Sequence, residues 1–144
     1  MLDSRPTRST ELPHLESLLN AHKLCFNDLE SQGVELFSVT KDNKPVGYFG
    51  YEVFGENALF RSFIVVPEEQ GKNYGVHIWN MAKEQLKERK VKHVYLLTNT
   101  ATDFFAKVGY TLFERAQVPE SIAQTSEFVT FCPSDSICMR YEIE

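Results

Sequence analysis

Residues 63–79, FIVVPEEQGKNYGVHIW, constrain the fold of this chain more than any other stretch. An apolar extended segment ends at a proline, a polar loop with Gly71 follows, and a helical pattern begins near Tyr74 and Gly75. The first N–H groups of a helix have no partners within it, and the helix dipole adds positive potential there. Because glycines let a ligand approach the backbone and Lys72 adds a cation, the loop suits phosphate oxygens. A glycine here also serves plain turn geometry, so the loop alone leaves both interpretations open.

The pattern on either side of this loop predicts an α/β domain of the α+β kind, with a mixed, mostly antiparallel central sheet and helices on both faces. Segments rich in Val, Phe and Tyr indicate strands, and apolar residues at helical spacing indicate helices. We expect Ser9 or Thr10 to cap the first helix and Thr100 to cap the last. The expected helices are 9–24, 26–32, 75–90 and 100–109, and the expected strands are a hairpin over 36–53, then 58–66, 93–98, 110–116 and 134–143.

The composition predicts one soluble domain over residues 1–144, because 42% of the residues are hydrophobic and 24% are charged. The net charge of −5 argues against nucleic acid as a partner, since that binding depends on Lys and Arg at phosphates. No apolar stretch approaches the ~20 residues of a membrane helix, so we expect no membrane contact. Cys25, Cys132 and Cys138 form no CxxC pair, which favours reduced thiols, a cytoplasmic location and no metal site.

The loop lacks GxGxxG and GxxxxGK[ST], which disfavours dinucleotide and nucleoside-triphosphate sites. It resembles instead the signature of the GNAT superfamily of N-acetyltransferases, in which V-x-P at a strand end leads into [QR]-x-x-G-x-[GA] and a helix. The matching residues are Val65-Val66-Pro67 and Gln70-Gly71-Lys72-Asn73-Tyr74-Gly75. Asn73 stands where the family has a glycine, and Asn is among the non-glycine residues that best tolerate positive φ.

A second motif lies downstream, where GNAT proteins have N-x-x-A-x-x-F-Y-x-x-x-G-[FY]. The residues at these positions are Thr98, Ala101, Phe104, Phe105, Gly109 and Tyr110. The matched elements together extend from about Ser38 to Tyr110. The segments LLTNTATDFFAKVGY and ESIAQTSEFVTFCPSDSICMR further resemble the group labelled arsenic-resistance-associated N-acetyltransferases. More distantly, they are similar to the acetyltransferase domain of N-acetylglutamate synthase.

The resemblance implies acetyl-CoA as the acetyl donor, with its pyrophosphate held by the loop. It also implies an oxyanion donor, the backbone N–H of Val65 in the splayed strand, and homodimers are common in the family. The implied coenzyme contacts are Phe63, Val65, Gln70, Gly71, Lys72, Asn73, Tyr74, Gly75, Val76, Phe104 and Phe105.

Chemical groups that GNAT enzymes commonly use are replaced at three places. Phe105 stands in place of a tyrosine that protonates the leaving thiolate, Thr98 replaces an asparagine, and Ser62 replaces a glutamate that activates the amine. Positioning of a neutral amine beside the thioester then carries more of the catalysis. Glu52 on the adjacent strand is our candidate base, acting directly or through water, and a salt-bridged structural glutamate is the alternative.

Arg61 lies in the middle of an apolar strand, where an unpaired charge would be costly. Its partner is either Glu52 or the carboxylate of a substrate. Ser62, Thr98 and Ser136 are further expected substrate contacts, the last through the likeness to the glutamate-acetylating domain. We therefore expect an acetyl-CoA-dependent N-acetyltransferase that transfers acetyl directly to the amine of a small molecule, an amino acid or a related compound. The alternatives are an acyl-CoA-binding module without catalysis and an enzyme that acetylates proteins or peptides.

Overall fold

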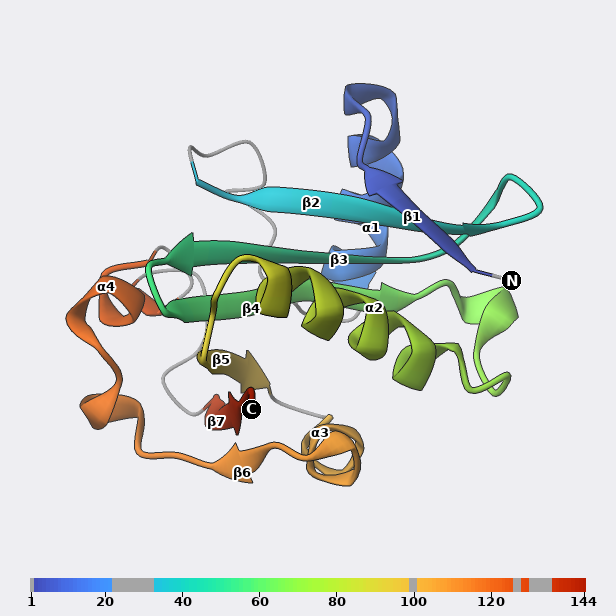
Figure 1. Ribbon diagram of the computed structural model, residues 1–144. Helices are drawn as coiled ribbons and strands as arrows, with labels where there is room; N and C mark the ends of the chain where they lie inside the picture. The colour runs from blue at the N-terminus through green and yellow to red at the C-terminus, as the bar shows by residue number, and fades with distance from the viewer. Residues whose placement is uncertain (1, 22–32, 99–100, 126–127, 130–135) are drawn as a thin grey trace.

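The computed structural model describes residues 2–21, 33–98, 101–125, 128–129 and 136–144 (Figure 1). The helices in these ranges are α1 Leu12–Ala21, α2 Tyr74–Glu88, α3 Thr102–Val108 and α4 Glu120–Ala123, with 3-10 turns at Ser9–Glu11, Pro67–Glu69 and Arg115–Gln117. The strands are β1 Asp3–Pro6, β2 Glu35–Lys41, β3 Lys44–Phe54, β4 Asn57–Val65, β5 His93–Thr98, β6 Thr111–Leu112 and β7 Ile137–Glu142. No helix among the described residues is long and apolar enough to cross a bilayer.

The strands form one mixed sheet in the order β1-β2-β3-β4-β5-β7-β6 (Figure 1). Within the described chain, β4 and β5 are the one parallel pair, because α2 carries the chain back across the sheet between them. The other neighbouring strands are antiparallel. The hairpin β2–β3 closes through Asp42 and Asn43, whose φ angles of 53° and 66° are those of a type I′ turn. The prediction of a mixed, mostly antiparallel sheet is confirmed.

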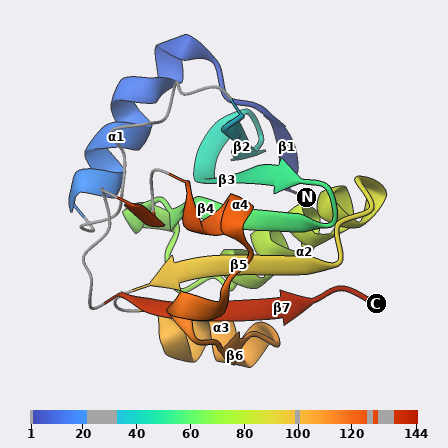
Figure 2. The same ribbon diagram turned by 90° about the vertical axis from the view of Figure 1, so that its left-hand side faces the viewer.

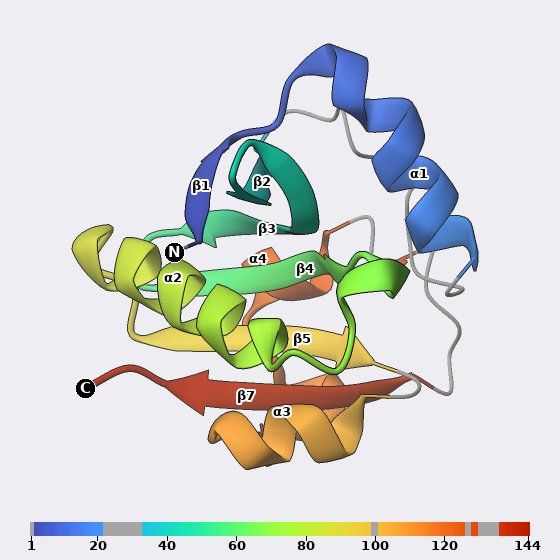
Figure 3. The same cartoon turned by 90° about the vertical axis from the view of Figure 1, so that its right-hand side faces the viewer.

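Helices cover both faces of the sheet, as predicted. α2 and α3 pack on one face, where Trp79 and Phe105 meet Phe60 of β4. On the opposite face Ile122 of α4 packs with Leu59, and α1 buries two leucines against β3 and β4. Leu59 and Phe60 enter different cores because successive side chains of a strand point to opposite faces. α4 lies in front of β4 and β5 in Figure 2, and α2 lies in front of them in Figure 3, which views the sheet from the other side.

The N-terminal region differs from the prediction. The sequence pattern does not indicate β1, which pairs with β2 at the sheet edge and has no run of apolar residues. Ser9 and Thr10 do not cap α1, because they form a 3-10 turn that precedes it. The carboxylate of Glu11 accepts the backbone N–H of Arg8 at 2.9 Å and so stabilises this turn. The expected helix 26–32 and the Thr100 cap lie outside the described residues.

The strand expected over 110–116 is much shorter. β6 spans Thr111–Leu112 and pairs only with β7 in the described residues, after which the chain enters the 3-10 turn Arg115–Gln117. β6 lies at the edge of the sheet, so a single neighbouring strand stabilises it. The apolar spacing of this segment is therefore a poor guide to strand length.

Candidate active site

β4 and β5 separate along their length and open the centre of the sheet. Backbone pairing joins them at Asn57–His93, Ala58–Val94 and Leu59–Tyr95. Among the described residues no pairing between these two strands continues beyond that point, and Figure 3 shows them diverging towards their C-terminal ends. Across the opening, the backbone groups of residues 60–65 in β4 do not pair with those of residues 96–98 in β5. The first turn of α2 follows the end of β4 through a short loop.

A β-bulge interrupts β4 at the start of the opening. The register with β3 shifts between Tyr48 and Gly50, so that Ser62 and Phe63 together oppose one residue of β3. Ser62 has φ 56°, a left-handed value that is costly for a residue with a Cβ atom. The extra residue also breaks the alternation of the strand, and it brings Phe63 onto the same face as Phe60, with 5.6 Å between the ring centroids.

Val65 directs its backbone groups towards the opening. The N–H of the next residue, Val66, donates to the carbonyl of Val46 on β3 at 2.9 Å. Because successive peptide groups of a strand point to opposite edges, the N–H and C=O of Val65 face away from β3. The Val65 carbonyl accepts a hydrogen bond from Nε2 of Gln70 at 3.1 Å, which ties the loop to the strand end. The Val65 N–H therefore has the orientation that an oxyanion donor requires.

The loop before α2 contains two left-handed residues. Gly71 has φ 86°, and Asn73, directly before the helix, has φ 65° and ψ 20°. Asn73 thus takes the conformation for which a glycine would otherwise be needed. The N–H groups of Tyr74, Gly75 and Val76 belong to the first turn and have no partners inside the helix. Left-handed residues beside a helix N-terminus are suited to bind an anion.

Two lysines lie at this end of α2. The Nζ of Lys72 is 2.7 Å from Oε2 of Glu69, and this hydrogen bond raises the pKa of Lys72. The Nζ of Lys41 donates to the hydroxyl of Tyr74 at 3.2 Å and lies 5.7 Å from the centroid of its ring. Lys41 was not predictable from the sequence, because it precedes Tyr74 by 33 residues and only the folded hairpin brings the two together.

Phe63 and Phe104 form an apolar wall beside the start of α2. Their rings stack with 5.4 Å between centroids and 20° between planes. A Cβ atom on Gly75 would lie 3.0 Å from the ring of Phe104, so the glycine permits this close packing. Phe105 is only 5% exposed and packs against Phe60 in the core. Phe63 and Phe104 are thus partly exposed, whereas Phe105 packs against both rings from the core side.

Arg61 and Glu52 form a buried ion pair. The distance between Nη1 of Arg61 and Oε2 of Glu52 is 3.0 Å, and the side chains are 0% and 10% exposed. Nε of Arg61 also donates to Oγ of Ser62 at 3.3 Å. Arg61 follows Leu59 by two positions, so it faces the same side of the sheet as α1 and α4. Of the two partners considered for Arg61, the structure shows Glu52.

Thr98 and Ser136 lie at the end of β5 and the start of β7. The Oγ1 of Thr98 accepts the backbone N–H of Ala101 at 3.1 Å and so stabilises the start of α3. Thr98 is opposite Ile137, the residue after Ser136, and both polar side chains belong to buried residues. Thr98 thus has a structural role in α3, whereas Ser136 borders the pocket described below.

Cys138 and Tyr110 are poorly suited to proton transfer or nucleophilic attack at neutral pH. Burial raises the pKa of the Cys138 thiol to about 11, and nearby Arg115 lowers it only partly. Burial also raises the pKa of Tyr110 well above its ordinary value. Cys25 and Cys132 lie outside the described residues. The raised pKa therefore disfavours the Cys138 thiol as a nucleophile.

A comparison with protein families matches residues 3–110 to the acetyltransferase (GNAT) family. None of the curated proteins matches the chain. The match includes the opened strands, the loop and helices α1 to α3, and it therefore covers the geometry described above.

Solved structures share the fold at low sequence identity. N-acetylglutamate synthase from Neisseria gonorrhoeae, complexed with coenzyme A and L-arginine, is 15% identical with a TM-score of 0.82 and 99% of this chain covered. The chain spans about a third of that protein, 33% of its length. Rv2747 from Mycobacterium tuberculosis, in complex with CoA and NLQ, is 18% identical over 99% of both chains, with a TM-score of 0.78. The ribosomal-protein-S18-alanine N-acetyltransferase from Escherichia coli is 17% identical over 100% of this chain and 95% of that one, with a TM-score of 0.69.

Proposed function

This chain belongs to the acetyltransferase (GNAT) family, and we propose that it transfers the acetyl group of acetyl-CoA directly to the amine of a small molecule, an amino acid or a related compound. The observation that carries the proposal is the opening between β4 and β5 beside the N-terminus of α2. The narrower resemblance to the arsenic-resistance-associated group, the cytoplasmic location and a homodimer stay predictions.

The residues around the opening fit the parts of acetyl-CoA. Backbone N–H groups from Gly71 to Val76 suit the phosphates, and Lys72 and Lys41 supply positive charge nearby. The rings of Phe63 and Phe104 offer an apolar wall for the arm that carries the thiol. Acetyl-CoA supplies the activated thioester, so the protein has to bind it, orient it and stabilise charge.

The backbone N–H of Val65 is our proposed donor to the carbonyl oxygen of the thioester as negative charge develops there. The amine nitrogen forms the new bond to the carbonyl carbon, the carbon–sulfur bond breaks, and the sulfur leaves as the thiolate of coenzyme A. Glu52 is the proposed acceptor of the amine proton, directly or through water. Its Oε2 accepts the bond from Arg61, so the other oxygen, Oε1, is the atom assigned to the proton in this proposal.

The choice of acceptor is supported by the likeness to N-acetylglutamate synthase, one structure of which is complexed with coenzyme A and N-acetyl-glutamate. A second candidate is a protein acceptor, favoured by the likeness to the ribosomal-protein-S18-alanine N-acetyltransferase. An acyl-CoA-binding module without catalysis is the third, because Phe105, Thr98 and Ser62 replace chemical groups common in the family.

An acceptor panel separates these candidates. The purified chain is incubated with acetyl-CoA and amino acids, polyamines, aminoglycosides or short peptides, and thiol release is followed. We expect turnover with amino acids above that with peptides. Turnover restricted to peptides would favour a protein acceptor, and coenzyme binding without turnover on any amine would favour a binding module.

A further inference from the structure

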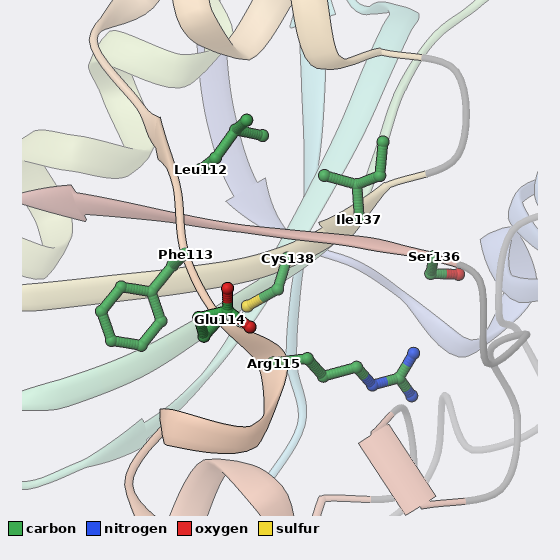
Figure 4. A pocket seen from close by; sticks show the side chains of 7 residues that line it. All are labelled: Leu112, Phe113, Glu114, Arg115, Ser136, Ile137 and Cys138. Carbon is green, nitrogen blue, oxygen red and sulfur yellow. The ribbon is translucent and has the colours of Figure 1, made fainter.

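A hollow lies beside the start of β7, outside the coenzyme loop. Its volume is about 350 Å³, and its polar lining includes Glu114, Arg115 and Ser136. In Figure 4 the guanidinium end of Arg115 extends towards the side of the pocket where Ser136 lies, and Cys138 forms part of the lining between the β6 and β7 segments.

The pocket lies on the β7 side of the opening between β4 and β5, because β7 is the strand next to β5 in the sheet. Cys138 of β7 pairs with Leu97 of β5. Leu97 comes two residues after Tyr95, the last residue of β5 that pairs with β4. Cys138, Leu97 and Leu59 belong to one buried cluster, so they face the same side of the sheet. Arg61 faces this side too, because it follows Leu59 by two positions. Arg61 and the pocket thus lie on one face, on the two sides of the opening.

Arg61 and Arg115 differ in their surroundings. The buried guanidinium of Arg61 is bound by the carboxylate of Glu52 at 3.0 Å. Nη2 of Arg115 donates to the backbone carbonyl of Phe128 at 2.9 Å, and the guanidinium carbon lies 5.4 Å from the centroid of the Phe128 ring. These contacts hold the planar group in one orientation while its charge acts on the pocket, where it opposes the rise in the pKa of Cys138.

Resting on the proposed function, we propose that this pocket is the acceptor subsite for a carboxylate, with Arg115 as its binding residue and the hydroxyl of Ser136 as a second donor. The acceptor is then a carboxylate-bearing amine whose nitrogen reaches the opening between β4 and β5. A guanidinium binds a carboxylate through two parallel hydrogen bonds, so its orientation matters as well as its charge. Glu114 lines the same pocket and weakens the attraction for the carboxylate.

Matched substrates and variants test this assignment. The substrates are the standard L-amino acids and their α-carboxamides, which differ in the carboxylate alone. The variants are Arg115→Gln, Arg115→Lys, Ser136→Ala and Glu114→Gln. Arg89→Gln is the control, because Arg89 forms an exposed ion pair with Glu35 and neither residue lines the pocket. Thermal unfolding of each variant checks folding, and Arg115→Lys with Ser136→Ala carries the test if Arg115→Gln does not fold.

We expect Arg115→Gln to raise KM for the free amino acid on the order of tenfold or more, with KM for acetyl-CoA and for the carboxamide unchanged. Glu114→Gln should lower KM for the free acid, and Arg89→Gln should leave it unchanged. The assignment is wrong if Arg115→Gln affects acid and amide equally, or if only amines without a carboxylate are acetylated, although the acetyltransferase function would then stand. Absence of turnover on every amine would instead overturn the proposed function and this inference together.

Discussion

Arg61 and Glu52 pair across β3 and β4 with 3.0 Å between Nη1 and Oε2, and the guanidinium is 0% exposed. The pair lies immediately before the bulge at Ser62, whose hydroxyl also accepts a bond from Arg61. One buried charge network therefore joins the candidate base to the distorted segment of β4. Because Glu52 already binds Arg61, replacing either residue should lower the stability of the folded protein as well as change any substrate contact.

Removing one partner of this pair should be strongly destabilising. We expect Arg61→Met to lower the free energy of unfolding by about 3–5 kcal/mol, because the Glu52 carboxylate is left buried without its counter-charge. The double variant Arg61→Met with Glu52→Leu should recover most of that loss. Urea denaturation measures both, with Arg89→Met as a control that costs at most about 1 kcal/mol, since that pair is exposed. A loss near zero for Arg61→Met would show that the pair is not buried as described.

Ser62 should tolerate glycine better than a branched side chain, because its φ is 56°. We expect Ser62→Gly to stay within about 1 kcal/mol of the native protein and Ser62→Val to cost about 1–3 kcal/mol. Ser62→Ala keeps the Cβ atom and removes the hydroxyl, so it separates the two contributions. Thermal unfolding distinguishes the variants, and equal stability of the valine and glycine variants would contradict a left-handed backbone at this position.

Gly75 should control the affinity for the coenzyme without controlling the fold. A Cβ atom at this position lies 3.0 Å from the Phe104 ring and 3.5 Å from Phe63, so Gly75→Val displaces the apolar wall. Valine is the better helix former, so α2 itself should not weaken. We expect Kd for coenzyme A to rise about tenfold, or ~1.4 kcal/mol, by calorimetry. Asn73→Gly keeps the left-handed conformation and is the matched control, and unchanged affinity in Gly75→Val would place the coenzyme elsewhere.

Stability should fall in acid partly through Glu11. Its hydrogen bonds with Arg5, and secondly with the backbone of Arg8, lower the pKa of Glu11 from 4.5 to about 2. A carboxyl whose pKa is lower in the folded state stabilises that state above the unfolded pKa. This stabilisation is lost as the pH falls from about 5 to 2. Because the pair is partly exposed, we expect a contribution of about 1 kcal/mol.

The variant Glu11→Gln tests this contribution. Its free energy of unfolding should be lower than that of the native chain at pH 7, and the difference should shrink as the pH approaches 2. Chemical denaturation at a series of pH values gives the two curves. A difference that does not change between pH 7 and pH 2 would exclude Glu11 as a source of the acid dependence.

Local patterns predicted most of the fold because they reflect short-range physics. Turn residues between two segments rich in Val, Phe and Tyr located the β2–β3 hairpin, and helical spacing located α2. β1 escaped prediction because Asp3–Pro6 owes its extended form to pairing with β2 rather than to its own side chains. The strand predicted over residues 110–116 was longer than β6 for the same reason, since strand length depends on the neighbouring strands available for pairing.

The candidate site was predictable where a backbone motif defines it. The loop motif identified Gly71 and Asn73, which both adopt positive φ. The bulge at Ser62 was not predictable, because it depends on the register between β3 and β4. Lys41 and Arg115 escaped notice for a related reason: each reaches its site through contacts between segments distant in the sequence. Because a buried charge needs a partner, the sequence limited the partner of Arg61 to Glu52 or a substrate carboxylate. The structure was needed to identify Glu52 as the partner.

The most direct test of the account is the fate of the acetyl group. Isotopically labelled acetyl-CoA is incubated with the chain and the amino acid panel, and mass spectrometry follows both the amines and the intact protein. We predict one acetylated amine for each coenzyme A released, with no acetyl group retained on the protein. Labelled acetyl on the protein during turnover would contradict direct transfer, and tight coenzyme binding without any acetylated amine would contradict the enzyme assignment.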